Sequence, residues 1–154
     1  MLNGQQTAGN LFATENYFSS NAKGFIQQEI EEYRHNFKDS LEGIIKHWPS
    51  DYIIYGWLVS MKSGGAIRPH MHENGWISGS IYINVPRSPQ KDGGNLVLCV
   101  EDPKYTADEG PKSKKIVDIN TGSLCLFPSS LLHYTIPFES AEERIVLAFD
   151  VIPK

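Results

Sequence analysis

The spacing of apolar residues changes once along this chain, close to Pro49. From Phe25 to Trp48 apolar residues recur every three or four positions, which predicts an amphipathic helical segment that ends at the proline. Beyond it the period changes to two, which is typical of β-strands. We therefore expect a helical segment within residues 1–50 and a β-rich core over residues 51–154.

The β-rich core divides into short strands, because Gly, Pro, Asn and Asp residues mark turns between the alternating stretches. The predicted strands are 52–62, 66–70, 77–85, 95–100, 115–118, 123–127, 132–138 and 143–151. This pattern behind one helical segment favours a mainly β fold, a double-sheet jelly roll with the helical segment packed against an outer face. We expect one domain over residues 1–154. The polar stretch from Glu101 to Lys115 is predicted to be a solvated loop that can act as a lid.

Three of the five histidines have the spacing of a metal site. His70 and His72 follow a predicted strand, and His133 lies on a distant strand after a Phe-Pro turn. Two imidazoles one residue apart can bind one ion from a sheet edge, and a third completes a three-ligand face with open positions. Glu73 is the alternative ligand, although an extended chain directs its side chain away from that of His72.

The last predicted strand has two different faces. One face is apolar and suits packing under the helical segment: Ile145, Leu147, Phe149 and Val151. The other face carries small and polar side chains: Arg144, Val146, Ala148 and Asp150. Arg144 can reach into a barrel from this face and hold a carboxylate through two hydrogen bonds. A surface arginine paired with Glu142 or Glu143 is the alternative, and alternation does not decide between the two.

The strand after the histidine pair alternates in the same way. Its polar face carries Ser78, Ser80, Tyr82 and Asn84. We expect this face to line the interior, where it supplies hydroxyl and amide groups beside the metal site. A polar face turned to water is the ordinary alternative in an antiparallel sheet.

Charge and composition exclude several classes of function. The formal net charge is -4, so the chain lacks the basic surface that nucleic acid binds. Its longest apolar runs are short strands, far below the roughly 20 residues of a membrane span, and no signal peptide is evident at Met1. Cys99 and Cys125 are predicted to be buried thiols, which favours the reducing cytoplasm. His35 and His47 have charged neighbours and are expected at the surface.

Two blocks of the chain resemble the Fe(II)/2-oxoglutarate-dependent oxygenases, and most closely a small branch that reads His-x-His and then Trp-x-Ser-Gly. The first block runs from His70 to Tyr82 and contains Trp76-Ile77-Ser78-Gly79. The second runs from Gly122 through Phe127-Pro128 and His133 to Arg144. Gln6-Thr7 and Asn10-Leu11-Phe12 resemble the N-terminal segment of that branch, so the similarity spans nearly the whole chain.

The resemblance implies a double-stranded β-helix that binds Fe(II) and 2-oxoglutarate. By position it implies that His70, His72 and His133 are the iron ligands at the catalytic centre. Arg144 would hold the distal carboxylate of 2-oxoglutarate, with Tyr82 as the co-substrate tyrosine and Ser78 as a hydroxyl donor beside them. The implied reaction is the hydroxylation of a small molecule or peptide by O2, with release of succinate and CO2.

The chain departs from the family pattern at two positions. His72 stands where most of the superfamily has Asp or Glu, and Val146 stands where some members have a Ser that helps the arginine. Tyr82 can supply the hydroxyl that is missing at the second position.

Two other interpretations stay open. A cupin-type metalloenzyme uses a three-histidine site on the same broad fold without 2-oxoglutarate. Pro128 and His133 match the spacing of the second cupin motif, whereas the Glu of the first motif is missing at its expected distance. A non-catalytic jelly-roll binding module is the third interpretation. The sequence leaves the substrate and the oligomeric state open.

Overall fold

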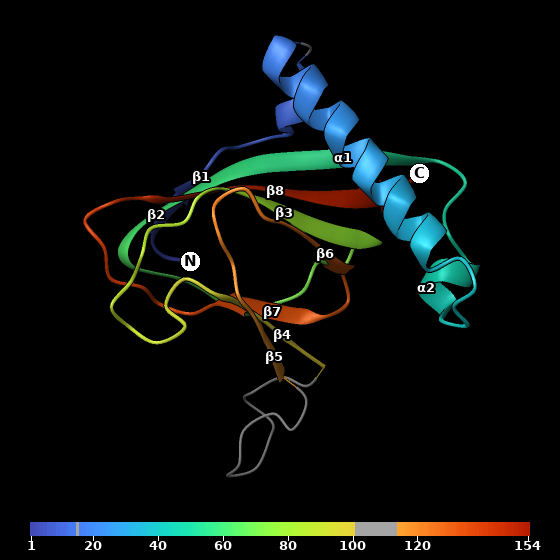
Figure 1. Cartoon of the computed structure of the whole chain (residues 1–154). Helices are drawn as coiled ribbons and strands as arrows, with labels where there is room; N and C mark the ends of the chain where they lie inside the picture. Colours follow the sequence, from blue (N-terminus) through green and yellow to red (C-terminus); the bar gives the residue numbers. More distant parts are fainter. Residues whose placement is uncertain (15, 101–113) are drawn as a thin grey trace.

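The computed structural model describes residues 1–14, 16–100 and 114–154 (Figure 1). Its helical elements are η1 (Leu11–Ala13), α1 (Tyr17–Asn36) and α2 (Gly43–Lys46). Its strands are β1 (Leu2–Gln6), β2 (Tyr52–His70), β3 (Ile77–Asn84), β4 (Leu96–Cys99), β5 (Lys114–Val117), β6 (Leu124–Pro128), β7 (Leu132–Thr135) and β8 (Arg144–Pro153). Most of the expected loop, residues 101–113, lies outside the described residues.

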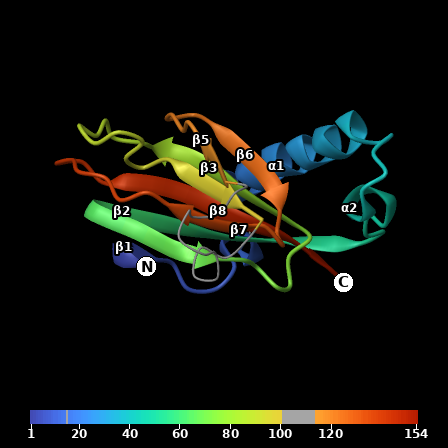
Figure 2. The same ribbon diagram turned by 90° about the horizontal axis from the view of Figure 1, so that it is seen from below.

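The strands form a curled antiparallel sheet with two layers that share β2 (Figures 1 and 2). One layer joins β1, β2, β8, β3 and β6. The other joins the end of β2 to β7, β4 and β5. This arrangement confirms the mainly β jelly roll that the strand pattern predicted.

The strand β2 is continuous, and the prediction of two strands over 52–62 and 66–70 was wrong. Gly64 has a φ of 75°, and its N–H donates to the carbonyl oxygen of Phe138 at 2.7 Å. Because glycine adopts positive φ without steric cost, the backbone changes layer here and remains hydrogen-bonded. The strand β1 was missed, since its residues are all exposed and show no apolar alternation.

The helix α1 lies across the outer face of the first layer (Figure 1). Its buried residues Ile26 and Ile30 pack in one cluster with Leu147, Phe149 and Val151 of β8. Burying each such side chain contributes about 1.5–3 kcal/mol. The expected packing of the helical segment on this face of the last strand is therefore confirmed, although the segment is interrupted between α1 and α2.

The inner faces of the two layers line a cavity of about 420 Å³. The strands β3 and β8 contribute Ser78, Ser80, Tyr82, Arg144, Val146 and Ala148, as their alternation predicted. Asn84 differs, because its side chain donates to the carbonyl oxygen of Glu143 at 2.8 Å. In the described part of the chain, no helix has the length and apolar character needed to cross a membrane.

Candidate metal centre

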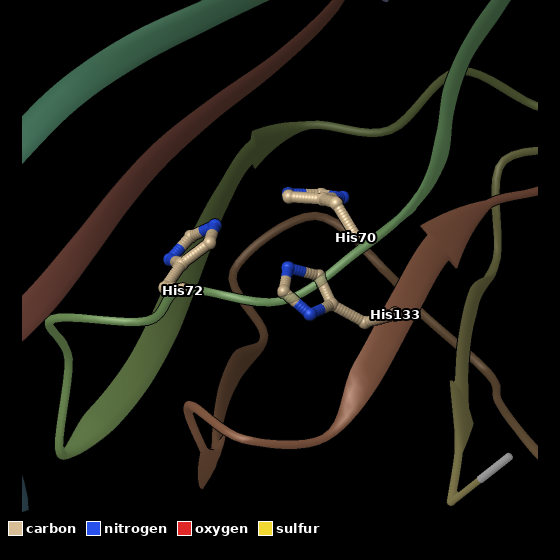
Figure 3. Close-up of side chains that lie close together, drawn as sticks. All are labelled: His70, His72 and His133. Carbon is tan, nitrogen blue, oxygen red and sulfur yellow. The ribbon is translucent and has the colours of Figure 1, made fainter. Parts of the chain in front are cut away.

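The side chains of the three predicted histidines point toward one another (Figure 3), and all three line the cavity. His70 is the last residue of β2, and His133 of β7 is its direct partner across the strand pair. His72 follows two residues later, in the loop to β3. One ligand atom from each ring lies within 4.8 Å of the others, and the ring centroids are 4.2 to 5.0 Å apart. These separations allow one ion to contact all three rings.

Backbone hydrogen bonds fix the loop that carries His72. The N–H of His72 donates to the carbonyl oxygen of Ser129 at 3.1 Å, and the N–H of Trp76 donates to that of Val151 at 2.7 Å. Gly75 leaves room for Ser129, because a Cβ at this position would overlap the serine side chain. The loop is thus held against the end of β6 and against β8.

Each imidazole has its Nδ1 atom engaged by an oxygen of the protein. Nδ1 of His70 lies 2.9 Å from the carbonyl oxygen of Arg68, and Nδ1 of His133 lies 3.0 Å from that of Leu131. Nδ1 of His72 lies 2.6 Å from the Oδ1 carboxylate oxygen of Asp150. Carbonyl and carboxylate oxygens accept, so Nδ1 carries the proton and Nε2 is left as the metal-binding atom. The donor set therefore fits a divalent transition metal.

Burial keeps two of these rings in the form that binds metal. It lowers the pKa of His133 to about 4, and it also lowers the pKa of His70. The hydrogen bonds to backbone oxygens and the charge of Asp150 act in the opposite direction, but burial outweighs them. Both rings are consequently neutral near pH 7, as metal coordination requires.

A buried hydrogen-bond network lies behind His72. Ser78 Oγ donates to Oδ1 of Asp150 at 2.7 Å and lies 2.8 Å from Oγ of Ser129. Ser78 and Asp150 are direct partners on β3 and β8, which explains their contact. Alternation placed both residues on the inner faces, but no local pattern indicated that Asp150 would meet His72. Ser78, predicted as a co-substrate donor, also lines the cavity.

Arg144 lies on the cavity wall with 2% of its surface exposed. Its Nε donates to the carbonyl oxygen of Gly94 at 3.2 Å, and its guanidinium carbon lies 5.1 Å from the ring centroid of Tyr82. Glu143 accepts instead from Ser60 Oγ at 2.6 Å. Within residues 1–14, 16–100 and 114–154, no carboxylate pairs with Arg144. A buried cation without an acid partner favours an anionic ligand.

Tyr82 lies beside this arginine, and only 2% of its surface is exposed. Burial raises the pKa of its phenol to about 12, against the opposing effect of Arg144. The hydroxyl therefore stays protonated at neutral pH and remains a hydrogen-bond donor.

The remaining candidates lie away from the three rings. Glu73 is exposed and is not part of the cluster of potential ligands in the described residues. His35 and His47 are exposed on the helical side, as expected. Trp57, in contrast, lines the cavity, and its ring centroid lies 5.7 Å from that of His72.

Residues 55–150 match the family model described as "Putative 2OG-Fe(II) oxygenase". No curated protein sequence matches the chain. Among solved structures, the chain is similar to a prolyl-4-hydroxylase from Pseudomonas putida, with 18% identity and a TM-score of 0.58. That match covers 98% of this chain and 71% of the hydroxylase.

Two further solved structures share the fold. HygX from Streptomyces hygroscopicus, with nickel and 2-oxoglutarate bound, is 12% identical with a TM-score of 0.61, over 99% of this chain and 71% of HygX. A prolyl hydroxylase from Trichoplax adhaerens, in complex with a hypoxia inducible factor peptide fragment, is 15% identical with a TM-score of 0.58. That match covers 97% of this chain and 62% of the hydroxylase. Identities this low establish a common fold and leave the substrate undetermined.

Proposed function

The chain belongs to the 2OG-Fe(II) oxygenase family, and on this premise we propose which residues carry its activity. His70, His72 and His133 hold Fe(II), and Arg144 and Tyr82 bind 2-oxoglutarate. The observation that carries the proposal is that one cavity contains both the three convergent imidazoles and the buried arginine. A metal site and an anion site in one cavity are what a metal-bound dicarboxylate needs.

The bound iron and 2-oxoglutarate would supply the oxidising chemistry, in which O2 and 2-oxoglutarate become succinate and CO2 as a substrate C–H bond becomes C–OH. The protein binds and orients the reactants. Arg144 holds the distal carboxylate of 2-oxoglutarate through its guanidinium group. The protonated phenol of Tyr82 donates a second hydrogen bond to that carboxylate, in place of the serine that some family members have at Val146. Apolar residues in the cavity wall keep water away: Val59, Leu96, Phe127 and Val146.

The substrate reaches the metal along a groove of about 350 Å³ beside His72. Tyr55 and Trp57 form an aromatic pair in this groove, with ring centroids 6.1 Å apart, and Glu73 and Asn74 also line it. Such a lining suits a small molecule or a peptide side chain. The peptide-bound prolyl hydroxylase of the same fold supports the peptide alternative.

The test is anaerobic addition of Fe(II) and 2-oxoglutarate to the purified protein, followed by exposure to O2. We expect a visible charge-transfer band before O2 and succinate afterwards. If neither appears, the proposal is wrong.

The variant Arg144→Ala separates this function from a cupin-type enzyme. We expect it to abolish 2-oxoglutarate binding and the charge-transfer band, while Fe(II) still binds. Arg87→Ala is the matched control, because Arg87 is exposed and outside the cavity lining. Unchanged metal-dependent turnover in Arg144→Ala would instead favour the cupin-type alternative, which uses no 2-oxoglutarate.

A further inference from the structure

We propose that Asp150 is a positioning residue that supplies, through His72, the negative charge that a carboxylate ligand supplies elsewhere in the superfamily. This inference rests on the proposed iron site. In non-haem iron oxygenases two histidines and one carboxylate usually face the metal. Here His72 takes the carboxylate position, so three neutral rings leave the charge of the ion uncompensated.

The contact between Asp150 and His72 is short and mostly buried. Oδ1 of Asp150 lies 2.6 Å from Nδ1 of His72, and the two side chains are 12% and 18% exposed. The residues are 78 positions apart in sequence, and both are fixed by neighbouring strands or loops. A charge-assisted hydrogen bond of this length in a partly dry site is stronger than a neutral one.

The other contacts of Asp150 orient its carboxylate toward the ring. Ser78 Oγ donates its single proton to the same oxygen, Oδ1, and Ser129 Oγ lies within reach to donate to Ser78. Within the residues that the structure describes, no lysine or arginine pairs with Asp150. A largely buried carboxylate needs a positive partner, and a metal ion held by His72 is the partner that this geometry provides.

A carboxylate behind a histidine ligand acts on the metal in two ways. It holds the ring in the orientation in which Nε2 faces the ion. It also makes Nε2 a stronger electron-pair donor to the metal, because the carboxylate accepts a hydrogen bond from the Nδ1 proton. The charge of the whole site then equals that of a site with two histidines and one carboxylate. His72 and Asp150 together therefore replace the missing ligand.

The first test measures Co(II) affinity from the visible ligand-field absorption of the 154-residue chain. Replacement of such an outer partner typically costs about 10- to 100-fold in metal affinity, and we expect a loss of that size in Asp150→Asn. The amide oxygen can still accept from Nδ1, so the loss reports the charge. Asp51→Asn is the matched control, because Asp51 is exposed and pairs with Lys154 far from the site, and it should bind Co(II) normally. An affinity within twofold of wild type in Asp150→Asn would overturn the inference.

The second test asks whether the effect of Asp150→Asn depends on His72. In His72→Asp a carboxylate stands at the ligand position itself, so the site no longer depends on Asp150 for its negative charge. We expect Asp150→Asn to lower Co(II) affinity clearly less in that background than in the wild type. A merely structural role would lower affinity equally in both backgrounds, and that result would contradict the proposal.

The third test needs no substitution and so does not depend on the folding of a variant. The proton NMR spectrum of the Co(II) protein should show three exchangeable, paramagnetically shifted N–H signals, one from each imidazole. Absence of the signal assigned to His72 would mean that His72 does not donate to Asp150, and the inference would fail. Failure of the proposed function is distinguishable, because the wild-type protein would then form no succinate, whatever the effect of Asp150→Asn on Co(II) affinity.

Discussion

The two faces of β8 are built by different kinds of interaction. The outer face packs Leu147, Phe149 and Val151 under α1, in a core held together by the burial of apolar surface. The inner face carries Arg144 and Asp150, each with a specific hydrogen-bond partner. Apolar packing is non-directional and tolerates similar side chains, whereas each polar contact depends on one atom in one place. The outer face should therefore control stability, and the inner face should control function.

The largest expected effect is the loss of metal in His133→Ala. This substitution removes one of the three proposed ligands, so the bound metal should fall from about one ion per chain to none detectable by elemental analysis. The free energy of unfolding of the metal-free protein should change less than in Phe149→Ala. His35→Ala, which removes an exposed histidine on α1, should retain the metal.

Loss of the folded state in His133→Ala would contradict this division of roles, because a residue that lines the cavity would then be needed for stability as well. Full metal occupancy in the same variant would show that two histidines suffice.

The second effect lies on the outer face. Phe149 is completely buried, and Phe149→Ala should destabilise the protein by about 3–5 kcal/mol through lost burial and the cavity that remains. Chemical denaturation measures this change. Phe25→Ala is the control, since Phe25 is 47% exposed and should cost much less.

The folded fraction of Phe149→Ala should still bind Co(II) with wild-type affinity. A large loss of affinity in that fraction would show that the two faces are coupled through β8.

The smallest effect concerns Tyr82. One hydrogen bond contributes about 0.5–1.5 kcal/mol, so Tyr82→Phe should weaken 2-oxoglutarate binding by roughly 2- to 12-fold, measured by titration of the charge-transfer band. Tyr17→Phe is the control, because Tyr17 is 89% exposed on α1 and lies outside the cavity lining. An unchanged 2-oxoglutarate affinity in Tyr82→Phe would show that Tyr82 does not bind the co-substrate.

The raised pKa of Tyr82 gives a second measurement on the same residue. Because the folded-state pKa of about 12 exceeds the ordinary value of 10.0, this group favours the folded protein below pH 10 and loses that effect as the pH rises toward 12. The phenolate absorbance of the wild type should therefore contain a late step near pH 12 that is missing in Tyr82→Phe. A spectrum without this difference would contradict the burial of the phenol.

The sequence predicted the parts of the site that depend on local spacing. The spacing along the chain was enough to single out the His-x-His pair at His70 and His72 and the third histidine, His133. The family match confirms the class of enzyme that this spacing indicated. The inward faces of β3 and β8 followed from alternation. The role assigned to each of these residues stays a prediction.

The parts that sequence reasoning missed depend on pairing between distant segments. Asp150 meets His72 only because β8 pairs with β3 in one register, and a shift of one residue would turn Asp150 outward. The continuity of β2 through Gly64 depends on bonds to Phe138 and β1, which a local turn signal does not reveal. Among the described strands, β1 pairs only with β2 and consists mostly of polar residues, so its sequence shows no alternation of apolar and polar positions.

The three Nδ1 contacts have a consequence for metal supply. The chain's own oxygens orient the rings, so metal uptake needs little rearrangement of the protein. A site of three ready nitrogen donors does not favour iron, because divalent copper and zinc bind such ligands more tightly than Fe(II) does. Protein made in zinc-rich medium should carry zinc and be inactive until chelation and reloading. In the cell, the ion that the proposed site carries should therefore depend on which ions are available to the folded protein.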